Sequence, residues 1–152
     1  MLAYPARYAP DEGNVVLAQV PDLPAVQTFG QGQAEAESMA LDAAKLVLAI
    51  YMEERRDIPA PSPMPRTSPD SDGWTYRMLQ LPALVSAKVA LYRAMRDQGV
   101  SELELARQLK LDSGRSGVER LLNPLITSPL DLLEQALEVL GKRLLVTVQD
   151  AA

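Results

Sequence analysis

The sequence contains no cysteine and no histidine among its 152 residues. Without cysteine the chain can form neither a disulfide nor a thiolate metal site. Without histidine it lacks the commonest general base and the commonest metal ligand. An enzyme with this composition would have to use carboxylates, or a Lys, Ser or Tyr nucleophile. We therefore expect no cofactor and no bound metal.

Long apolar runs are also missing from the sequence. No segment approaches the length needed to cross a membrane, and the chain does not open with a basic stretch followed by an apolar core. We expect a cytoplasmic protein with no membrane partner. Hydrophobic residues make up 47% and charged residues 23% of the chain, which is ordinary for a globular protein.

The charge is distributed unevenly along the chain. The net charge of −5 does not favour a general nucleic-acid binder. Residues 1–84 hold six Lys or Arg against eleven Asp or Glu, whereas residues 85–152 hold nine of each. Four cations of the second half cluster closely in sequence: Arg107, Lys110, Arg115 and Arg120. An acidic half joined to a half with a local cationic cluster predicts two partners, one of them basic.

The first half is predicted to be an α+β domain with a β-β-β-α-β order over residues 1–82. Short apolar runs bounded by turn residues predict strands, and a long run with helical periodicity predicts a helix. Two glycines, Gly30 and Gly32, break the chain just before the helix. The expected strands are residues 2–9, 15–20, 26–29 and 74–81, and the expected helix is residues 33–55.

The expected helix carries an apolar stripe that should pack against a small antiparallel sheet. The stripe consists of Ala36, Met39, Ala40, Ala43, Leu46, Val47 and Ile50. The segment that follows, residues 57–73, is rich in proline and is expected to be an exposed loop.

Residues 101–122 have the pattern of a helix-turn-helix. Ser101 is placed to cap the first helix, and Glu104 can complete a capping box. Leu103, Ala106 and Leu109 then share one helical face. The Ser- and Gly-rich segment 112–117 is expected to be the turn.

The second helix of this motif would bury Val118, Leu121 and Leu122. Its other face carries side chains that can hydrogen-bond base edges and phosphates in a major groove. The candidate DNA-binding residues, including neighbouring cations, are Ser113, Arg115, Ser116, Glu119, Arg120, Asn123, Arg107 and Lys110. Similar helix pairs also occur in plain helical bundles, so a motif that serves only to pair two chains remains an alternative.

The rest of the second half completes an all-α domain, residues 83–152, with a C-terminal strand. Helices are expected over residues 86–97 and 129–140, the latter capped by Ser128. Residues 143–149 form a strongly strand-favouring run, whose backbone needs a partner. Pairing with the same strand of a second copy would make a homodimer through Leu144, Val146 and Val148, and dimers could pair further into a tetramer. The alternative is pairing with the sheet of the first domain.

The order and spacing of these segments resembles the HicB antitoxins, in particular those with a Cro/C1-type helix-turn-helix. Lys110 departs from the family pattern, because a glycine is common at that position. The segments that carry the resemblance are Tyr4-Pro5-Ala6, Pro21–Pro24, Gly30–Gly32, Glu35-Ala36 with Ala40 and Ala44, Ile58–Ser62, Ala87–Met95, Glu104–Arg107 and Leu140–Leu144.

The resemblance implies a first domain that is a truncated relative of the ribonuclease H fold. It also implies inhibition of a HicA-type toxin, a small basic ribonuclease that cleaves mRNA, and repression of the toxin–antitoxin operon through operator DNA. Candidate toxin-binding residues are Asp11, Glu12, Asp22 and Tyr4. The competing enzymatic hypothesis places the three carboxylates around Mg²⁺ as a nuclease site.

Overall fold

The computed structural model describes residues 1–66 and 73–151, and part of the predicted loop, residues 67–72, lies outside the described residues. The chain forms two compact units, residues 1–86 and 87–152, which we call the N-terminal unit and the C-terminal unit. The mixed α+β class predicted from the sequence is confirmed. No helix among the described residues is long and apolar enough to cross a membrane.

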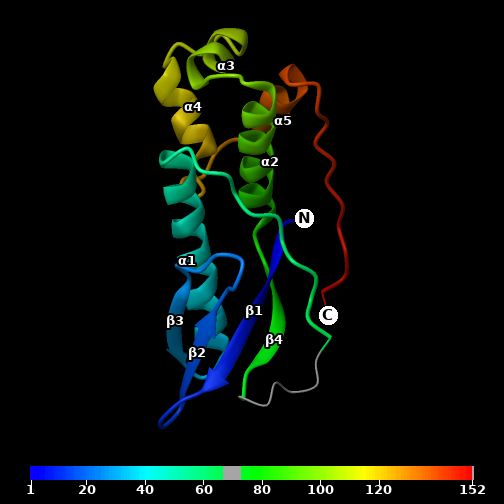
Figure 1. Cartoon of the computed structure of the whole chain (residues 1–152). Helices are drawn as coiled ribbons and strands as arrows, with labels where there is room; N and C mark the ends of the chain where they lie inside the picture. Colours follow the sequence, from blue (N-terminus) through cyan, green and yellow to red (C-terminus); the bar gives the residue numbers. More distant parts are fainter. Residues whose placement is uncertain (67–72, 152) are drawn as a thin grey trace. The chain divides into compact units, whose positions relative to one another are not determined.

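The N-terminal unit is built on a four-stranded antiparallel sheet with the order β3-β2-β1-β4 (Figure 1). Strand β1 pairs with both of its neighbours, so Arg7 lies opposite Gln19 of β2 and opposite Tyr76 of β4. The strands β3 and β4 therefore form the two edges of the sheet. The strands are β1 (Ala3–Pro10), β2 (Val15–Gln19), β3 (Gln27–Gln31) and β4 (Thr75–Gln80).

Helix α1, Gln33–Glu53, covers one face of this sheet (Figure 1). The predicted apolar stripe was partly wrong, because Met39, Leu46 and Ile50 are 44%, 50% and 39% exposed. The helix is apolar on more than one side, and the side that meets the sheet is the one with small residues. The buried residues of α1 are Ala36, Ala40, Ala44, Val47, Leu48, Tyr51 and Met52.

Gly30 explains why alanines form the buried side of α1. A Cβ atom built on Gly30 would lie 2.3 Å from the backbone nitrogen of Ala36 and 2.6 Å from the carbonyl carbon of Glu35. The backbone of α1 thus approaches β3 so closely that only a glycine fits. Larger side chains on the buried side of the helix would prevent this approach.

The C-terminal unit is helical and contains most of α2, which begins at Ala83. Its core includes Leu105 and Ala106, Val118 and Leu121, and Leu133, all at most 2% exposed. These residues come from three different helices, and α2 adds Val89 and Leu91, which are 1% and 0% exposed. The helices are α2 (Ala83–Gln98), α3 (Glu102–Gln108), α4 (Arg115–Leu122) and α5 (Leu130–Val139).

The helices α3 and α4 form the predicted pair, with differences in the turn. The predicted cap of α3 is confirmed, since the Ser101 hydroxyl oxygen accepts a hydrogen bond from the Glu104 amide at 3.1 Å. Helix α4 begins at Arg115, inside the segment predicted to be the turn. Gly114 makes this early start possible, because its φ of +61° is a conformation that other residues rarely adopt.

Three further expectations for the C-terminal unit differ from the structure. Leu103 is 47% exposed, and Leu105 takes its place in the core. Ser128 does not cap α5: the N-cap residue is Pro129, which has no side-chain donor or acceptor for this purpose. Residues 143–149 form no strand in the single chain, which is expected of a lone strand that has no partner for its backbone.

Candidate functional site

The outer face of α4 is open to solvent. Arg115, Ser116, Glu119 and Arg120 are all exposed, while Val118 on the opposite side is completely buried. The second helix of the motif therefore presents hydrogen-bonding side chains outward, as the sequence predicted. Arg107 and Lys110, at and just beyond the end of α3, are exposed as well.

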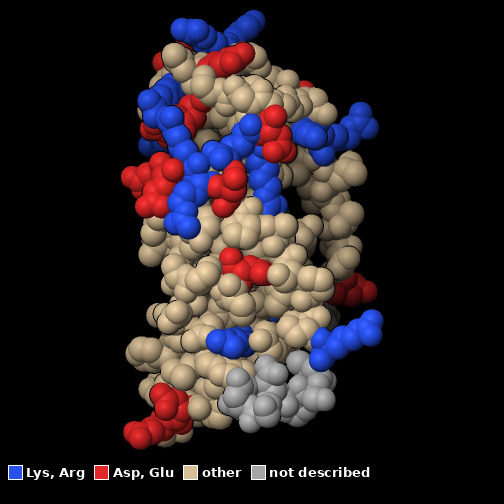
Figure 2. Space-filling model, viewed as in Figure 1, with Lys and Arg blue, Asp and Glu red and all other residues tan. Residues whose placement is uncertain are grey.

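Arg115 differs from the other cations because two carboxylates already hold it. Its Nε atom lies 3.0 Å from a carboxylate oxygen of Glu102 and 2.9 Å from one of Glu119. The positive charge of Arg115 is therefore largely offset in the free chain. Figure 2 shows the same mixture more widely, with blue and red atoms interspersed around α3 and α4. On the surface of α3 and α4, the exposed cations other than Arg115 are Arg107, Lys110 and Arg120.

Two of the predicted base-reading residues bond to nearby backbone instead. The Ser116 hydroxyl donates to the carbonyl oxygen of Ser113 at 2.8 Å. The Asn123 side-chain oxygen accepts from the Leu125 amide at 2.9 Å, and Asn123 is only half-exposed. These local bonds stabilise the two ends of α4, so Ser116 and Asn123 have a structural role in the free chain.

A buried lysine on α2 contacts the end of α4. Lys88 is 0% exposed, and its Nζ atom donates to the carbonyl oxygens of Asn123 and Ile126 at 2.8 and 2.7 Å. Loss of hydration in this site lowers the pKa of Lys88 from 10.5 to about 8. The sequence around Lys88 carries no local signal that this lysine will be buried.

In the N-terminal unit, two of the predicted toxin-binding residues have structural roles. Tyr4 is 0% exposed and its hydroxyl donates to the Pro59 carbonyl oxygen at 2.7 Å, so its predicted surface role is wrong. The Asp22 carboxylate accepts from the amide and the hydroxyl of Ser62 at 2.8 and 2.6 Å. Asp22 thus fastens the proline-rich segment to the turn between β2 and β3.

The enzymatic alternative fails on geometry. Asp11 and Glu12 are exposed in the turn that precedes β2, whereas Asp22 follows β2. The three carboxylates therefore lie at opposite ends of a strand and cannot surround one metal ion. Among the described residues, no group of three or more acidic side chains is placed to hold a metal ion.

The outer side of α1 carries an exposed surface that the sequence analysis had assigned to the core. Its apolar members are Met39, Leu46 and Ile50, which follow one another at helical spacing. Three exposed acids lie along the same line of the helix, one at each end and one between Met39 and Leu46. We call this set the α1 outer stripe, and its six residues are Glu35, Met39, Asp42, Leu46, Ile50 and Glu53.

The sheet has a second apolar surface, on the face opposite α1. Phe29 of β3 and Met78 of β4 are 60% and 46% exposed there. Arg7 lies between them in the sheet, where it donates to Gln19 and stacks on Trp74 at 4.5 Å from the ring centre. Figure 2 shows this face as mostly uncharged, with red atoms at the end where the β1–β2 hairpin turns.

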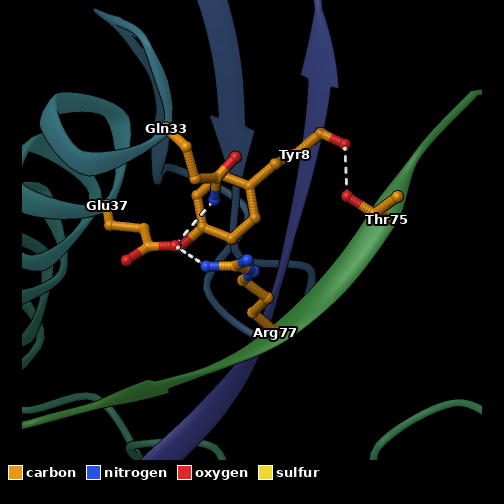
Figure 3. Close-up of polar contacts among 5 residues, drawn as sticks. All are labelled: Tyr8, Gln33, Glu37, Thr75 and Arg77. Carbon is orange, nitrogen blue, oxygen red and sulfur yellow. Dashed lines mark hydrogen bonds and ion pairs between the residues drawn. The ribbon is translucent and has the colours of Figure 1, made fainter.

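A polar cluster lies between α1 and β4 on the helix-covered face (Figure 3). Glu37 accepts from the Gln33 side chain at 2.7 Å and from Arg77 at 2.8 Å, beside the ring of Tyr8. Burial raises the pKa of Tyr8 to about 12; the charge of Glu37 adds to this effect and that of Arg77 opposes it. These groups border a shallow cavity of about 480 Å³. The two charged residues that line it, Glu37 and Arg77, bond to each other. The cluster joins helix α1 to strand β4 through Glu37 and Arg77.

Comparison with known proteins identifies the family of this chain. A family model described as "HicB_like antitoxin of bacterial toxin-antitoxin system" matches residues 3–90. The chain is 34% identical to Antitoxin HicB of Pseudomonas fluorescens (strain Pf0-1) over 99% of this chain and 97% of the relative. It is 31% identical to Antitoxin HicB of Escherichia coli (strain K12), over 94% and 96% of the two chains. The chain therefore belongs to the HicB-like antitoxins of bacterial toxin–antitoxin systems.

Proposed function

We propose that this protein neutralises a HicA-type toxin, a small basic ribonuclease, and represses its own operon by binding operator DNA. It acts by covering the toxin rather than by catalysis, in the cytoplasm where the toxin's mRNA substrates and the operon are. The observation that carries the DNA-binding part is the open outer face of α4, opposite a fully buried apolar side. The toxin-binding part is supported by family membership and by the acidity of the first half of the chain.

The α1 outer stripe is the surface that we propose for the toxin. Its exposed apolar side chains supply area to bury, and its acids Glu35 and Glu53 suit a basic partner, whereas Asp42 already pairs with Lys45 at 2.8 Å. Asp11 and Glu12 can add to the negative field from the hairpin turn. The open face of the sheet has apolar side chains too, but Arg7 is the charged residue at its centre.

A charge placed in the middle of the stripe tests this assignment. Leu46 is half exposed, so Leu46→Lys leaves the fold intact, and we expect it to weaken toxin binding by about tenfold or more. The matched control is Phe29→Lys on the open face of the sheet, which should bind toxin as the wild type does. Titration calorimetry with purified toxin measures both. If Phe29→Lys weakens toxin binding and Leu46→Lys does not, the toxin binds the open face of the sheet instead of the α1 outer stripe.

A gel shift with the DNA upstream of the operon tests the DNA-binding part. Arg120 is exposed and is not engaged by Glu102 or Glu119, so Arg120→Ala should weaken binding and lower the salt slope by about one. Arg115→Ala should have a smaller effect, because two carboxylates already offset its charge. Arg66→Ala, an exposed arginine of the N-terminal unit, is the control. If the wild type binds no upstream DNA, the helix pair serves only to join two chains.

We also propose that residues 143–149 pair with the same segment of a second copy. Val146 and Val148 are 67% and 94% exposed in the single chain and Leu144 is half-exposed, so a partner strand would have apolar side chains to cover. A two-fold dimer of this kind suits a palindromic DNA site. Truncation after Lys142 is expected to convert the dimer into a monomer on analytical ultracentrifugation. A truncated chain that remains dimeric would contradict the proposed pairing.

A further inference from the structure

Lys88 is the buried charged side chain among the described residues, and its surroundings are made of oxygen atoms. Besides Asn123 and Ile126, its Nζ atom lies 2.8 Å from the hydroxyl of Ser128 and 3.3 Å from the carbonyl oxygen of Arg120. The Ser128 hydroxyl in turn donates to the same Arg120 oxygen at 3.4 Å. One ammonium group thus connects α2 with four positions that are spread over residues 120–128.

These four positions are the last turn of α4 and the chain that leaves it. Arg120 is in α4, Asn123 is its C-cap, and Ile126 and Ser128 precede α5. The last carbonyl groups of a helix have no partner within the helix, and the helix dipole favours a positive charge at the C-terminal end. Lys88 supplies both the donors and the charge at this end of α4.

A buried ammonium group costs free energy, so stability alone does not explain a lysine here. Removal of an ion from water is expensive, and well-packed apolar residues often serve stability as well or better. An ammonium group, unlike an apolar group, can hold several oxygen atoms at once: three N–H donors are shared here among three carbonyl oxygens and one hydroxyl, which keeps those four oxygens close together. The geometry fixed here is the position of the end of α4.

We propose that Lys88 is a positioning residue for DNA binding, which holds α4 so that its outer face meets the DNA although Lys88 itself touches no DNA. This inference rests on the proposed DNA-binding function. It assigns to a residue of α2 an effect on phosphate contacts made by Arg120 and its neighbours. A residue with only a structural role would lower the folded fraction but leave the folded protein's affinity unchanged.

Lys88→Met keeps the length of the side chain and removes its donors and charge. At a temperature where circular dichroism shows the variant folded, we expect the affinity for upstream DNA to fall by about tenfold, with a shallower salt dependence. Gln98→Met is the matched control. It removes a bond from the same helix to a different element, since the Gln98 amide donates to the carbonyl oxygen of Leu140, the C-cap of α5, at 2.8 Å. Gln98→Met should bind DNA with wild-type affinity and slope.

Folded Lys88→Met with wild-type affinity and slope would overturn the inference and leave the proposed function standing. If Lys88→Met does not fold, Ser128→Ala carries the test, because it removes one of the four oxygen partners and should lower affinity about threefold with the same change of slope. Unchanged binding by folded Ser128→Ala would then overturn the inference.

Amide hydrogen exchange separates this inference from the proposed function. The amides of Asn123 and Ile126 donate to the carbonyl oxygens of Glu119 and Asn123, and they should exchange faster in Lys88→Met. The amide of Leu105 in α3, which donates to Ser101, should not change. A wild type that binds no DNA would refute the proposed function. Exchange that is equal in the two proteins at both α4-side amides would refute the positioning role, whether or not DNA binds.

Discussion

Replacing Gly30 with alanine is expected to lower the free energy of unfolding of the N-terminal unit by about 3 kcal/mol. The added Cβ atom would overlap backbone atoms of Glu35 and Ala36, and backbone cannot swing aside as a flexible side chain can. Helix α1 and strand β3 would have to move apart, which loosens the contact of the buried alanines with the sheet. Urea denaturation of wild type and variant measures the difference.

Gly13→Ala is the control for this experiment. Gly13 has a φ of +67° and nothing within 4 Å of an added Cβ atom, so alanine there is strained but not crowded. We expect a loss of about 1 kcal/mol from the backbone conformation alone. An equal loss in the two variants would show that the close approach of α1 to β3 contributes nothing.

The stability of the C-terminal unit is expected to rise with pH above about 8, and Lys88 is the reason. In the folded unit the pKa of Lys88 is about 8, below the ordinary value of 10.5 that applies to the unfolded chain. Between these values the unfolded chain holds more protons, so the free energy of unfolding increases with pH, by about 2 kcal/mol from pH 8 to pH 10. Below pH 8 both forms are protonated and the dependence disappears.

Denaturation at several pH values, in the wild type and in Lys88→Met, isolates this contribution. The rise should be absent from the variant, and a rise that persists there would contradict the assignment to Lys88. The comparison should stop near pH 10, because the pKa of Tyr8 is raised from 10.0 to about 12 in the folded N-terminal unit. Above pH 10 the folded chain therefore holds the extra proton on Tyr8, and the free energy of unfolding falls as pH rises.

Local signals in the sequence predicted much of the fold. Turn residues and alternating apolar residues located the four strands, and Ser101 located the start of α3. Periodicity alone placed α1 correctly and identified Ala36 and Ala40 as buried, but it also assigned Met39 and Leu46 to the core, and these two are exposed. Hydrophobicity alone does not determine which of two apolar sides of a helix packs on a sheet. In α1 the side with the small residues Ala36, Ala40 and Ala44 packs on the sheet, because the helix backbone approaches Gly30 closely.

The site residues were harder to predict, because their roles depend on partners far away in the sequence. Tyr4, within a predicted strand, and Asp22, near a turn, were candidate toxin contacts, but each bonds to the proline-rich segment, at Pro59 and Ser62. Lys88 likewise finds its partners beyond residue 119. The outward face of α4 could be predicted, since its apolar and polar residues separate at helical spacing within eight residues.

The pairing of Arg115 with Glu102 and Glu119 has a consequence for anion selectivity. Any anion that approaches this guanidinium must displace two tethered carboxylates, whose local concentration is fixed by the chain itself. A single dissolved phosphate competes poorly against such neighbours. In the proposed DNA complex, the closely spaced phosphates of a duplex would engage Arg107, Lys110 and Arg120, and Arg115 would be the last of these cations to exchange partners. On that proposal, the two carboxylates would favour a dense polyanion over small ions.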